Sequence, residues 1–527
     1  MSLQKSRFSL PGFSLPVNHQ ELEWSLDPVQ IEGGFVERLD THREIVMRQI
    51  MSSIIDKLNG IARYIIVFDE EITTKWREEV AVSGRDFSPK MMDWVIQELQ
   101  WKAGYLSETG HVLVFDGGVV ISDTVIPPDL QQELRSAIAP FEMLKKDFHP
   151  GSDEKVVDLV HPSLFPVITV ALGSSQIRRW NQAGLLIDRY SKKFQWMPCN
   201  VEFGEDGGCH VNGQLYQVIE KILAKTIPLW SSTLSNVDNT KRRIPYDEVV
   251  YTPQRSGSSY SKWEAERRIV QPEPGDFNPE AVSPENSVQL REKFPSGLQV
   301  IVKLANIELS PEKPEYHSGS WHVEGALNEH ICATAIYYYD NENITDNSLA
   351  FRQRTNPEEM GEMGYEQDQH EFLQEVFGFG PHVEGRDDTQ ITQEIGGIFT
   401  KEGRLLTFPN KLQHRVSPFS LADKSKPGHR KILAFFLVDP HYRIISSANV
   451  PPQREDWWEG KRKEIFNVFP TRLPLELQNM VMSHVNVGHI TMEEACQYRL
   501  EFMEERSAKT QEENEAFETG DFNLCEH

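Results

Sequence analysis

Hydrophobic residues recur at helical spacing in three segments near the start of the chain. The periodicity predicts amphipathic helices over residues 43–58, 91–105 and 215–230, the last of them ending at Pro228. The short apolar runs HVLVF and FPVITVAL between these segments are typical of strands. We interpret residues 41–230 as a mainly helical region whose helices support the rest by packing. An extended arm over residues 1–40, punctuated by Pro, Ser and Gly, precedes it.

The pattern changes twice in the second half of the chain. Residues 231–294 are polar and rich in turn-forming residues, which predicts a long surface connection or insertion. β-Branched and aromatic runs then predict strands over residues 298–309, 331–340, 403–408 and 429–439. Strands this continuous favour a barrel or jelly roll over β-α-β units. We therefore expect an α+β fold with a double-stranded β-helix (jelly-roll) core over residues 295–450.

Helical signals return after the predicted core. Residues 451–506 are expected to form C-terminal helices. Thr491 and Glu494 have the spacing of a capping box that opens a helix running through Arg506. Residues 507–527 are acidic and predict a frayed tail. The predicted core thus has helical elaborations on both sides.

Composition and charge exclude several classes of protein. The 54 basic and 79 acidic residues give a net charge of −25, which argues against a protein that coats nucleic acid, because such proteins need cations to displace counterions. No apolar run approaches the roughly 20 residues that span a bilayer, and the first residues lack the apolar centre of a signal peptide. The five scattered cysteines include no Cys-x-x-Cys pair, so a disulfide framework is not expected. These features predict a cytoplasmic protein.

The pattern that points to chemistry begins at His322-Val-Glu324. On a strand, residues i and i+2 point to the same face, so the two side chains can converge on one ion. A second histidine from another strand would complete two imidazoles and one carboxylate. Such a facial triad suits non-haem Fe(II), because it leaves positions open for oxygen and a co-substrate. The pattern alone is weak, since His-x-Glu also occurs at His19, His42 and His382.

Sequence context separates these four candidates. His19 lies in the N-terminal arm, and His42 opens a predicted helix, on which positions i and i+2 diverge. His382 is the stronger rival, because it repeats the letters His-Val-Glu-Gly, yet it lies among Gly, Pro and charged residues without an adjoining strand. His322 lies between two predicted strands and is therefore the preferred ligand.

Two downstream residues strengthen this pattern. His414 follows the strand and turn GRLLTFPNKLQ, and Arg430 lies sixteen residues later, at the start of the strand HRKILAFFLVD. A buried arginine can bind a carboxylate through two parallel charge-assisted hydrogen bonds, as the distal end of 2-oxoglutarate would require. The alternative interpretation is an unconnected set of core histidines and an arginine that ends a strand.

The segments SGSWHVEG, LQHRV and KPGHRKILAFFLVDP resemble the Fe(II)/2-oxoglutarate-dependent oxygenase superfamily. Together with KWREEV, VHPSLFP and RLEFMEER, they resemble more narrowly a large fungal family known as a domain of unknown function. The resemblance implies Fe(II) on His322, Glu324 and His414, 2-oxoglutarate on Arg430, and O2 as co-substrate. Glu324 is a less common substitute for Asp at the middle ligand, and it argues against the halogenases of this superfamily, which lack that carboxylate. The segment GGCHVNGQLY departs from the family pattern.

The strand ICATAIYYYD is expected to line the substrate pocket. Strand alternation separates Ile336 and Tyr338 from the two neighbouring tyrosines. We expect the face with Ile336 and Tyr338 to line the pocket, although consecutive tyrosines are equally typical of sheet packing with hydroxyls at the rim. Asn328 and Arg352 are polar groups near this strand that could hold substrate. An ordinary turn and a surface arginine are the competing interpretations.

The sequence therefore predicts an oxygenase that oxidises an unactivated C–H bond of a small molecule by hydroxylation, desaturation or ring closure. The resemblance adds fungal specialised metabolism and small amino acids as a substrate class. Two other hypotheses stay open. A hydroxylase or demethylase of basic proteins would fit the charge of −25 and the insertion, and a cupin-like binding protein would keep the ligands without turnover. No nucleic-acid or membrane partner is expected, and the oligomeric state is left open.

Overall fold

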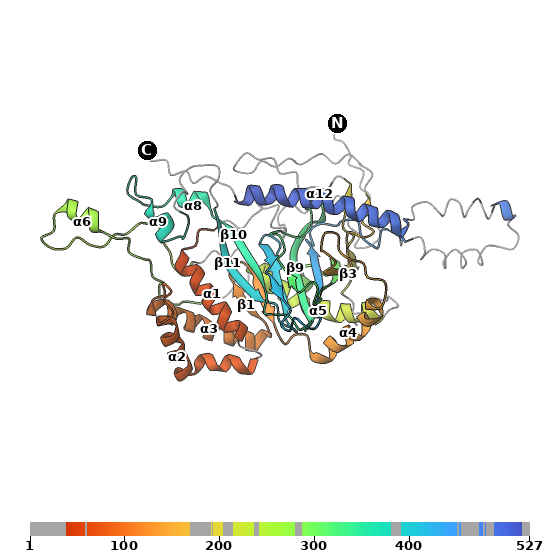
Figure 1. Ribbon diagram of the computed structural model, residues 1–527, viewed down its shortest axis with the longest axis horizontal. Helices are drawn as coiled ribbons and strands as arrows, with labels where there is room; N and C mark the ends of the chain where they lie inside the picture. The colour runs from red at the N-terminus through yellow and green to blue at the C-terminus, as the bar shows by residue number, and fades with distance from the viewer. Residues whose placement is uncertain are drawn as a thin grey trace, which may run out of the picture.

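The fold combines α-helices with antiparallel sheets, as seen in a computed structural model (Figure 1). The structure describes residues 38–57, 61–168, 191, 193–203, 214–236, 242–279, 287–380, 391–450, 453–454, 474–477, 480 and 490–518. The helices are α1 (His42–Lys57), η1 (Ile61–Phe68), α2 (Glu70–Ala81), α3 (Pro89–Thr109), α4 (Pro128–Glu142), α5 (Gln214–Ser235), α6 (Tyr260–Glu266), α7 (Leu290–Lys293), η2 (Leu327–Glu329), α8 (Pro357–Gly361), α9 (Glu371–Glu375) and α12 (Met492–Glu518).

Three of these helices correspond to the periodic segments of the sequence. Helices α1 and α3 lie where the periodicity predicts them, and α3 begins after the N-cap Ser88 and ends at Gly110 in the left-handed conformation. The predicted end of the third helix at Pro228 is wrong, because α5 continues to Ser235. Proline costs a helix one backbone hydrogen bond, but Trp230 and the residues around it are buried, and this packing sustains the helix.

A large antiparallel sheet and a small one form the centre of the molecule. The large sheet has the order β1-β2-β12-β9-β15-β7-β3, with β6 also paired to β7, and the small sheet has the order β11-β10-β13. Two further pairs are β14 with β8 and β4 with β5. The strands of the large sheet are β1 (Val112–Phe115), β2 (Val119–Ser122), β3 (Val156–Val160), β6 (Cys199–Val201), β7 (Leu298–Leu309), β9 (Ile331–Glu342), β12 (Leu405–Pro409) and β15 (Gly428–Val438). The others are β4 (Val167–Ile168), β5 (Phe194–Gln195), β8 (Glu315–Tyr316), β10 (Ser348–Arg354), β11 (Thr392–Phe399), β13 (Gln413–Val416) and β14 (Phe419–Ser420).

The large sheet buries both of its faces. Its inner face, which includes Ile301, Ile336 and Phe436, packs in one hydrophobic cluster with residues of the small sheet. Its outer face, which includes Tyr337 and Leu433, packs in a second cluster with helices α4 and α5. Four strands of this sheet come from residues before 295, so the sheet core begins earlier in the chain than predicted.

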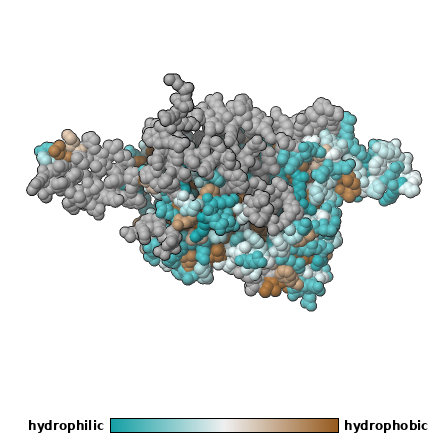
Figure 2. Space-filling model, turned by 180° about the vertical axis from the view of Figure 1, so that it is seen from behind, coloured by the Kyte–Doolittle hydropathy of each residue, from teal (hydrophilic) through white to brown (hydrophobic). Residues whose placement is uncertain are grey.

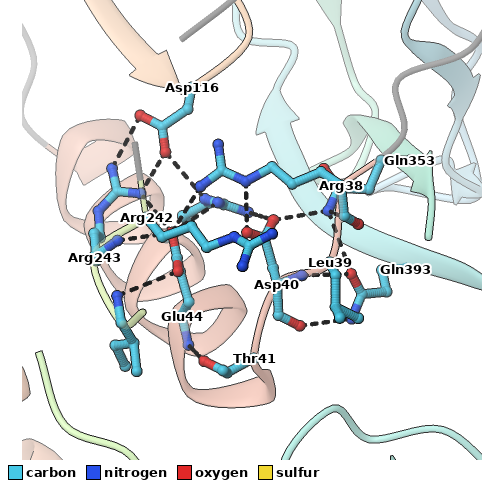
Figure 3. A network of polar contacts seen from close by, with 12 residues as sticks. Arg38, Leu39, Asp40, Thr41, Glu44, Asp116, Arg242, Arg243, Gln353 and Gln393 are labelled. Atoms are coloured by element: carbon cyan, nitrogen blue, oxygen red, sulfur yellow. Dashed lines mark hydrogen bonds and ion pairs between the residues drawn. The ribbon is translucent and has the colours of Figure 1, made fainter. Parts of the chain in front are cut away.

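The segment over 231–294 is more than the surface connection that its polar composition predicts. Arg243 and Ile244 are buried, and the Arg243 guanidinium donates to both carboxylate oxygens of Glu98 on α3 (2.8 and 2.7 Å) and contacts Asp116 after β1. Beside it, Arg48 on α1 donates to Asp40 (2.7 Å). This buried ionic network joins α1, α3, the β1–β2 turn and residues 242–244. Figure 3 shows its part around Asp40, Glu44, Asp116 and Arg243.

Charge compensation explains how the network tolerates burial. Burial alone would raise the pKa of the Glu98 carboxyl, but the positive charges of Arg243 and Lys102 lower it to about 2. Likewise, Arg48 holds the pKa of Asp40 far below its ordinary value against the effect of burial. A polar segment can therefore lie in the interior, because each of these charges has a partner.

Helix α12 crosses the ends of the strands, opposite the helices of the N-terminal half (Figure 1). Its capping box is confirmed, because Glu494 N donates to Thr491 Oγ1 (3.1 Å) and Thr491 N donates to the Glu494 carboxylate (2.9 Å). The predicted frayed tail from residue 507 is wrong up to Glu518, where the helix ends. Ala516 and Phe517 are buried, and this burial orders a stretch that its acidic composition disfavours.

The exposed surface is mixed in polarity. On the face seen in Figure 2, hydrophobic side chains form small patches between hydrophilic ones over the described residues. Among the helices that the structure describes, none combines the length and apolarity needed to cross a membrane.

We expect Arg243→Met to lower the free energy of unfolding by about 3–5 kcal/mol, because removing one partner leaves buried carboxylates uncompensated. Lys75→Met is the matched control, since Lys75 pairs with Glu79 on the exposed surface, where an ion pair contributes about 0–1 kcal/mol. Urea unfolding of the three proteins measures both effects. Equal losses in the two variants would contradict the structural role of the network.

Candidate metal centre

Backbone pairing brings two distant segments together at the open end of the sheets. His322 and His414 form an antiparallel bridge, in which His322 N donates to His414 O (3.2 Å) and His414 N donates to His322 O (3.0 Å). Their imidazole centroids lie 4.5 Å apart. Glu324 extends to the same point, with its Oε1 3.7 Å from His322 Nε2 and 3.6 Å from His414 Nε2. The structure thus brings together the three ligands predicted from the sequence.

Backbone carbonyls orient both imidazoles. His322 Nδ1 lies 2.8 Å from Ser320 O, and His414 Nδ1 lies 3.3 Å from Leu412 O. A proton on each Nδ1 satisfies these carbonyls, so each Nε2 is left with its electron pair directed toward Glu324. Two nitrogen electron pairs and a carboxylate oxygen repel one another unless a proton or a cation lies between them.

The pKa values of the three groups show the effect of a proton in this position. Burial would raise the pKa of the Glu324 carboxyl, but hydrogen bonds from the histidines, when their Nε2 atoms are protonated, hold it well below its ordinary value. Burial would lower the pKa of His322, but its hydrogen bond with Glu324 raises it. For His414, burial and the charge of His322 lower the pKa together. The cluster therefore favours a single positive charge at its centre.

The donor set fits a transition-metal ion. Bonds of about 2.0–2.2 Å allow two ligand atoms of one ion to lie up to about 4 Å apart, and Glu324 Oε1 lies 3.7 and 3.6 Å from the two Nε2 atoms. Two imidazoles and one carboxylate are the donor set of the facial arrangement used by non-haem Fe(II). His414 is almost fully buried, whereas the His322 side chain keeps 33% of its exposure, so the cluster has one open side.

Two further residues shape the turn that carries Glu324. Asn410 accepts from Glu324 N (2.8 Å) and donates to Glu324 O (2.8 Å), which fixes the backbone of the ligand. Gly325 has φ +77°, and a Cβ there would lie 2.5 Å from Ile331 Cδ1. Only glycine suits this position, which explains the last letter of His-Val-Glu-Gly.

Arg430 lies on the inner face of β15 and is almost fully buried. One of its terminal nitrogens donates to Asn347 Oδ1 (2.7 Å), its Nε has no partner, and its guanidinium lies 5.1 Å from the ring centroid of Phe419. No carboxylate pairs with Arg430 among the described residues. Burial lowers the pKa of Arg430, and an unpaired buried guanidinium costs several kcal/mol unless an anion binds it.

Ile336 and Tyr338 lie on the inner face of β9, in the hydrophobic cluster that also contains Phe351 and Phe408. The rings of these two phenylalanines contact His414, with centroid distances of 6.4 and 4.6 Å. The neighbouring tyrosines of the strand pack on the outer face with α4 and α5. The inner residues of β9 therefore share a hydrophobic cluster that reaches the metal ligands.

Asn328 and Arg352 are held in contacts between segments. Asn328 accepts from Ser191 N (3.1 Å) and donates to Phe194 O (2.9 Å). Arg352 donates to Gln413 (2.7 Å) and to Glu518 of α12 (2.6 Å). Their polar atoms are occupied in these contacts. The rival motif at His382 lies outside the described residues.

A second group of potential ligands occurs at His149, Asp158 and His161. Ser163 N donates to His161 Nδ1 (3.1 Å), so the neutral ring carries its proton on Nε2 and has no free electron pair for a metal. The guanidinium of Arg499 also lies 3.8 Å from Asp158. An adjacent cation disfavours a metal ion, and the first group is the better metal centre.

Helix α12 reaches the metal centre through Asn514. Its Nδ2 donates to Trp321 O (2.9 Å), and its Oδ1 accepts from Gln413 Nε2 (3.1 Å) and Arg352 (3.1 Å). Trp321 and Gln413 directly precede the two histidine ligands, so one amide group ties both ligand segments to the helix. Neither Asn514 nor Asn410 carries a sequence signal, since the first lies in an acidic stretch and the second in an ordinary Pro-Asn turn.

Comparisons with known proteins give a family and several distant structural matches. A family model described as "Protein of unknown function (DUF4246)" matches residues 89–461. No curated protein matches the chain.

Three of the similar solved structures have low TM-scores. The Fe(II)/(alpha)ketoglutarate-dependent dioxygenase TqaL has a TM-score of 0.24 and 11% identity, over 70% of this chain and 95% of that chain. IDO from Bacillus thuringiensis has a TM-score of 0.16 and 14% identity, over 27% of this chain and 48% of that chain. AviO1 from Streptomyces viridochromogenes Tue57 has a TM-score of 0.23 and 8% identity, over 64% of this chain and 94% of that chain.

We expect Asn514→Ala to weaken metal binding by about tenfold, at the lower end of the effects seen for groups that orient metal ligands. The mutation frees both segments that carry histidine ligands. Gln511→Ala on the exposed side of α12 is the matched control, because Gln511 bonds only to Glu515. Cobalt(II) titration followed by visible absorption measures affinity and ligand geometry together. Wild-type affinity and spectrum in Asn514→Ala would contradict the positioning role.

Proposed function

This chain belongs to the family described as a protein of unknown function, DUF4246, and we propose that it is a non-haem Fe(II)/2-oxoglutarate-dependent oxygenase. Its reaction oxidises an unactivated C–H bond of a small molecule. One observation carries the proposal: a buried arginine without a carboxylate partner among the described residues shares the interior with a group of two histidines and a glutamate. A metal ion would bind the group of two histidines and a glutamate, and an organic anion would balance the charge of the arginine.

The strand order supports a double-stranded β-helix as the scaffold. Along the chain, β7, β9, β12 and β15 belong to the large sheet, while β8, β10, β11, β13 and β14 lie between them in sequence and pair only with one another. Chain segments therefore alternate between two facing layers, as in a jelly roll. In such a scaffold the ligands would lie at the open end, where His322 would bridge to His414 on β13, at the edge of the small sheet.

The residues of the cluster have distinct roles in this proposal. His322 Nε2, Glu324 Oε1 and His414 Nε2 would hold the iron. When bound, iron supplies the activation of O2 that organic side chains lack. In the overall reaction, 2-oxoglutarate loses CO2 and takes up one oxygen atom of O2, which gives succinate. The other oxygen atom is used to oxidise the substrate. The protein contributes position, charge and exclusion of water.

Arg430 would bind the distal carboxylate of 2-oxoglutarate. Its free Nε and its remaining terminal nitrogen provide two donors in a planar fork, which matches a carboxylate. Asn347 holds the guanidinium from the other side, and Phe419 and Tyr338 cover it with aromatic rings. Burial strengthens this charged hydrogen bond by removing competing water.

Ile336 and Tyr338 would line the substrate pocket. Both lie on the inner face of β9 in the cluster that reaches His414. The resemblance to fungal oxygenases makes small molecules of specialised metabolism, amino acids among them, the first substrates to screen. The cytoplasmic location expected from the scattered cysteines belongs to the same proposal.

We expect His322→Ala and His414→Ala to lose stoichiometric iron binding, because each removes one of three ligands. The chain provides its own control in His382→Ala, which changes the second His-Val-Glu-Gly motif. Anaerobic iron titration distinguishes the two motifs. The assignment is overturned if His382→Ala loses iron while His322→Ala keeps it.

We expect Arg430→Ala to raise the 2-oxoglutarate concentration required for succinate formation roughly thirtyfold or more, since truncating a buried charged partner costs about 2–5 kcal/mol. Arg430→Lys keeps the charge but loses the fork, so its requirement should also rise while iron binding persists. Arg415→Ala is the control, because Arg415 pairs with Glu394 on the surface. An unchanged requirement in Arg430→Ala, or a raised one in Arg415→Ala, would move the role away from Arg430.

A further inference from the structure

Strand β7 carries a lysine on the inner face of the large sheet. Its residues alternate, so that Val300 and Leu304 pack in the outer cluster with α5, while Ile301 packs in the inner cluster. Lys303 lies two residues from both Ile301 and Ala305, so its side chain points to the same inner face of the sheet. It is half-buried. A lysine in this position needs an explanation, because lysine is seldom buried unless it is paired.

Lys303 lies in one row with two residues of the neighbouring strands. It pairs with Ala434 on β15, and Ala434 pairs with Ile336 on β9. These three residues cross the inner face, with the smallest side chain in the middle. Neighbouring strands lie about 4.8 Å apart, so the backbones of Lys303 and Ile336 are about 10 Å apart. Lys303 is thus separated only by an alanine from the residue that we propose to line the pocket.

No hydrogen bond or ion pair engages the Lys303 ammonium among the described residues. On the opposite face of the same sheet, Lys431 contacts both Glu142 and Asp340. The inward carboxylate nearest in register, Asp158 beside Ala305, is instead 2.9 Å from His149 Nδ1. Lys303 is therefore available to a ligand.

Electrostatics agree with this location. Burial holds the pKa of His161 well below its ordinary value, and the positive charge of Lys303 adds to the effect. His161 follows β3, whose last residue, Val160, pairs with Leu304 beside Lys303. The lysine charge thus acts within the interior, where solvent screens it less than at the surface.

Arg430 and Lys303 belong to different rows of the inner face. Ala434, the partner of Lys303, lies four residues from Arg430, or about 13 Å along a strand. In the proposed reaction 2-oxoglutarate already uses one carboxylate at the metal and the other at Arg430. A second cation in the interior is left for the molecule that is oxidised.

We infer that Lys303 binds an acidic group of the substrate, and that the substrate is a small molecule bearing a carboxylate. This inference rests on the proposed function, because it takes the space beside Ile336 as the substrate pocket. Lys303 would hold the charged end over Ala434, and the carbon to be oxidised would extend toward His414. The lysine thus selects acids against their uncharged analogues and orients the chain relative to the metal.

Matched pairs of probes test this directly. Hexanoate, 3-phenylpropanoate and their primary amides are titrated by calorimetry into the full-length protein, both unloaded and loaded with manganese(II) and 2-oxoglutarate. We expect at least one acid to bind about tenfold or more tightly than its amide, as one lost charged hydrogen bond implies. Lys303→Met should abolish this preference, Lys303→Arg should retain it, and Lys431→Met on the outer face should leave it unchanged.

Three results would overturn the inference: amides that bind as well as acids, an acid preference that survives in Lys303→Met, or a wild-type protein that binds neither member of any pair. Manganese(II) affinity measured in the same variants shows whether Lys303→Met has damaged the fold. Failure of the proposed function is distinguishable, because it appears as absent manganese(II) or 2-oxoglutarate binding in the wild type. In that case the titrations of unloaded protein still decide whether Lys303 binds the acids.

Discussion

The backbone bridge between His322 and His414 is the contact on which the candidate site depends. It fixes two segments ninety-two positions apart, and the carbonyls beside it turn both Nε2 atoms toward the Glu324 carboxylate. Other contacts hold these segments in place although the electron pairs repel one another. Asn410 holds the turn from one side, and Asn514 of α12 holds both histidine segments from the other.

Charge is balanced differently in the two halves of the interior. In the N-terminal half, buried arginines such as Arg243 contact carboxylates directly, and the network is complete within the protein. Around the metal centre, Arg430 and Lys303 face inward without an acidic partner among the described residues. Unbalanced charge is costly in an interior, so this contrast separates a region whose charges are paired within the protein from the region where we propose that anions bind.

Patterning along the chain predicted the parts of the structure that local physics controls. β-Branched runs gave the bounds of β7 as observed. His322 and Glu324 do come together, but a bridge residue followed by a bend carries them, not the strand that the i, i+2 rule assumes. Patterning along the chain could not predict contacts between segments that are distant in sequence. The polar composition around Arg243 and the acidic composition around Asn514 both suggest solvent, but their partners lie far away in sequence, and only the folded chain reveals them.

The central claim is that the interior holds a metal ion and a dicarboxylate together. Its most direct test is calorimetric titration of the manganese(II)-loaded protein with 2-oxoglutarate and with 2-oxobutanoate, which lacks the distal carboxylate. We expect the wild type to favour 2-oxoglutarate by roughly thirtyfold or more, as a buried charged pair implies, and Arg430→Met to bind both compounds equally. Equal binding of the two compounds by the wild type would contradict the claim.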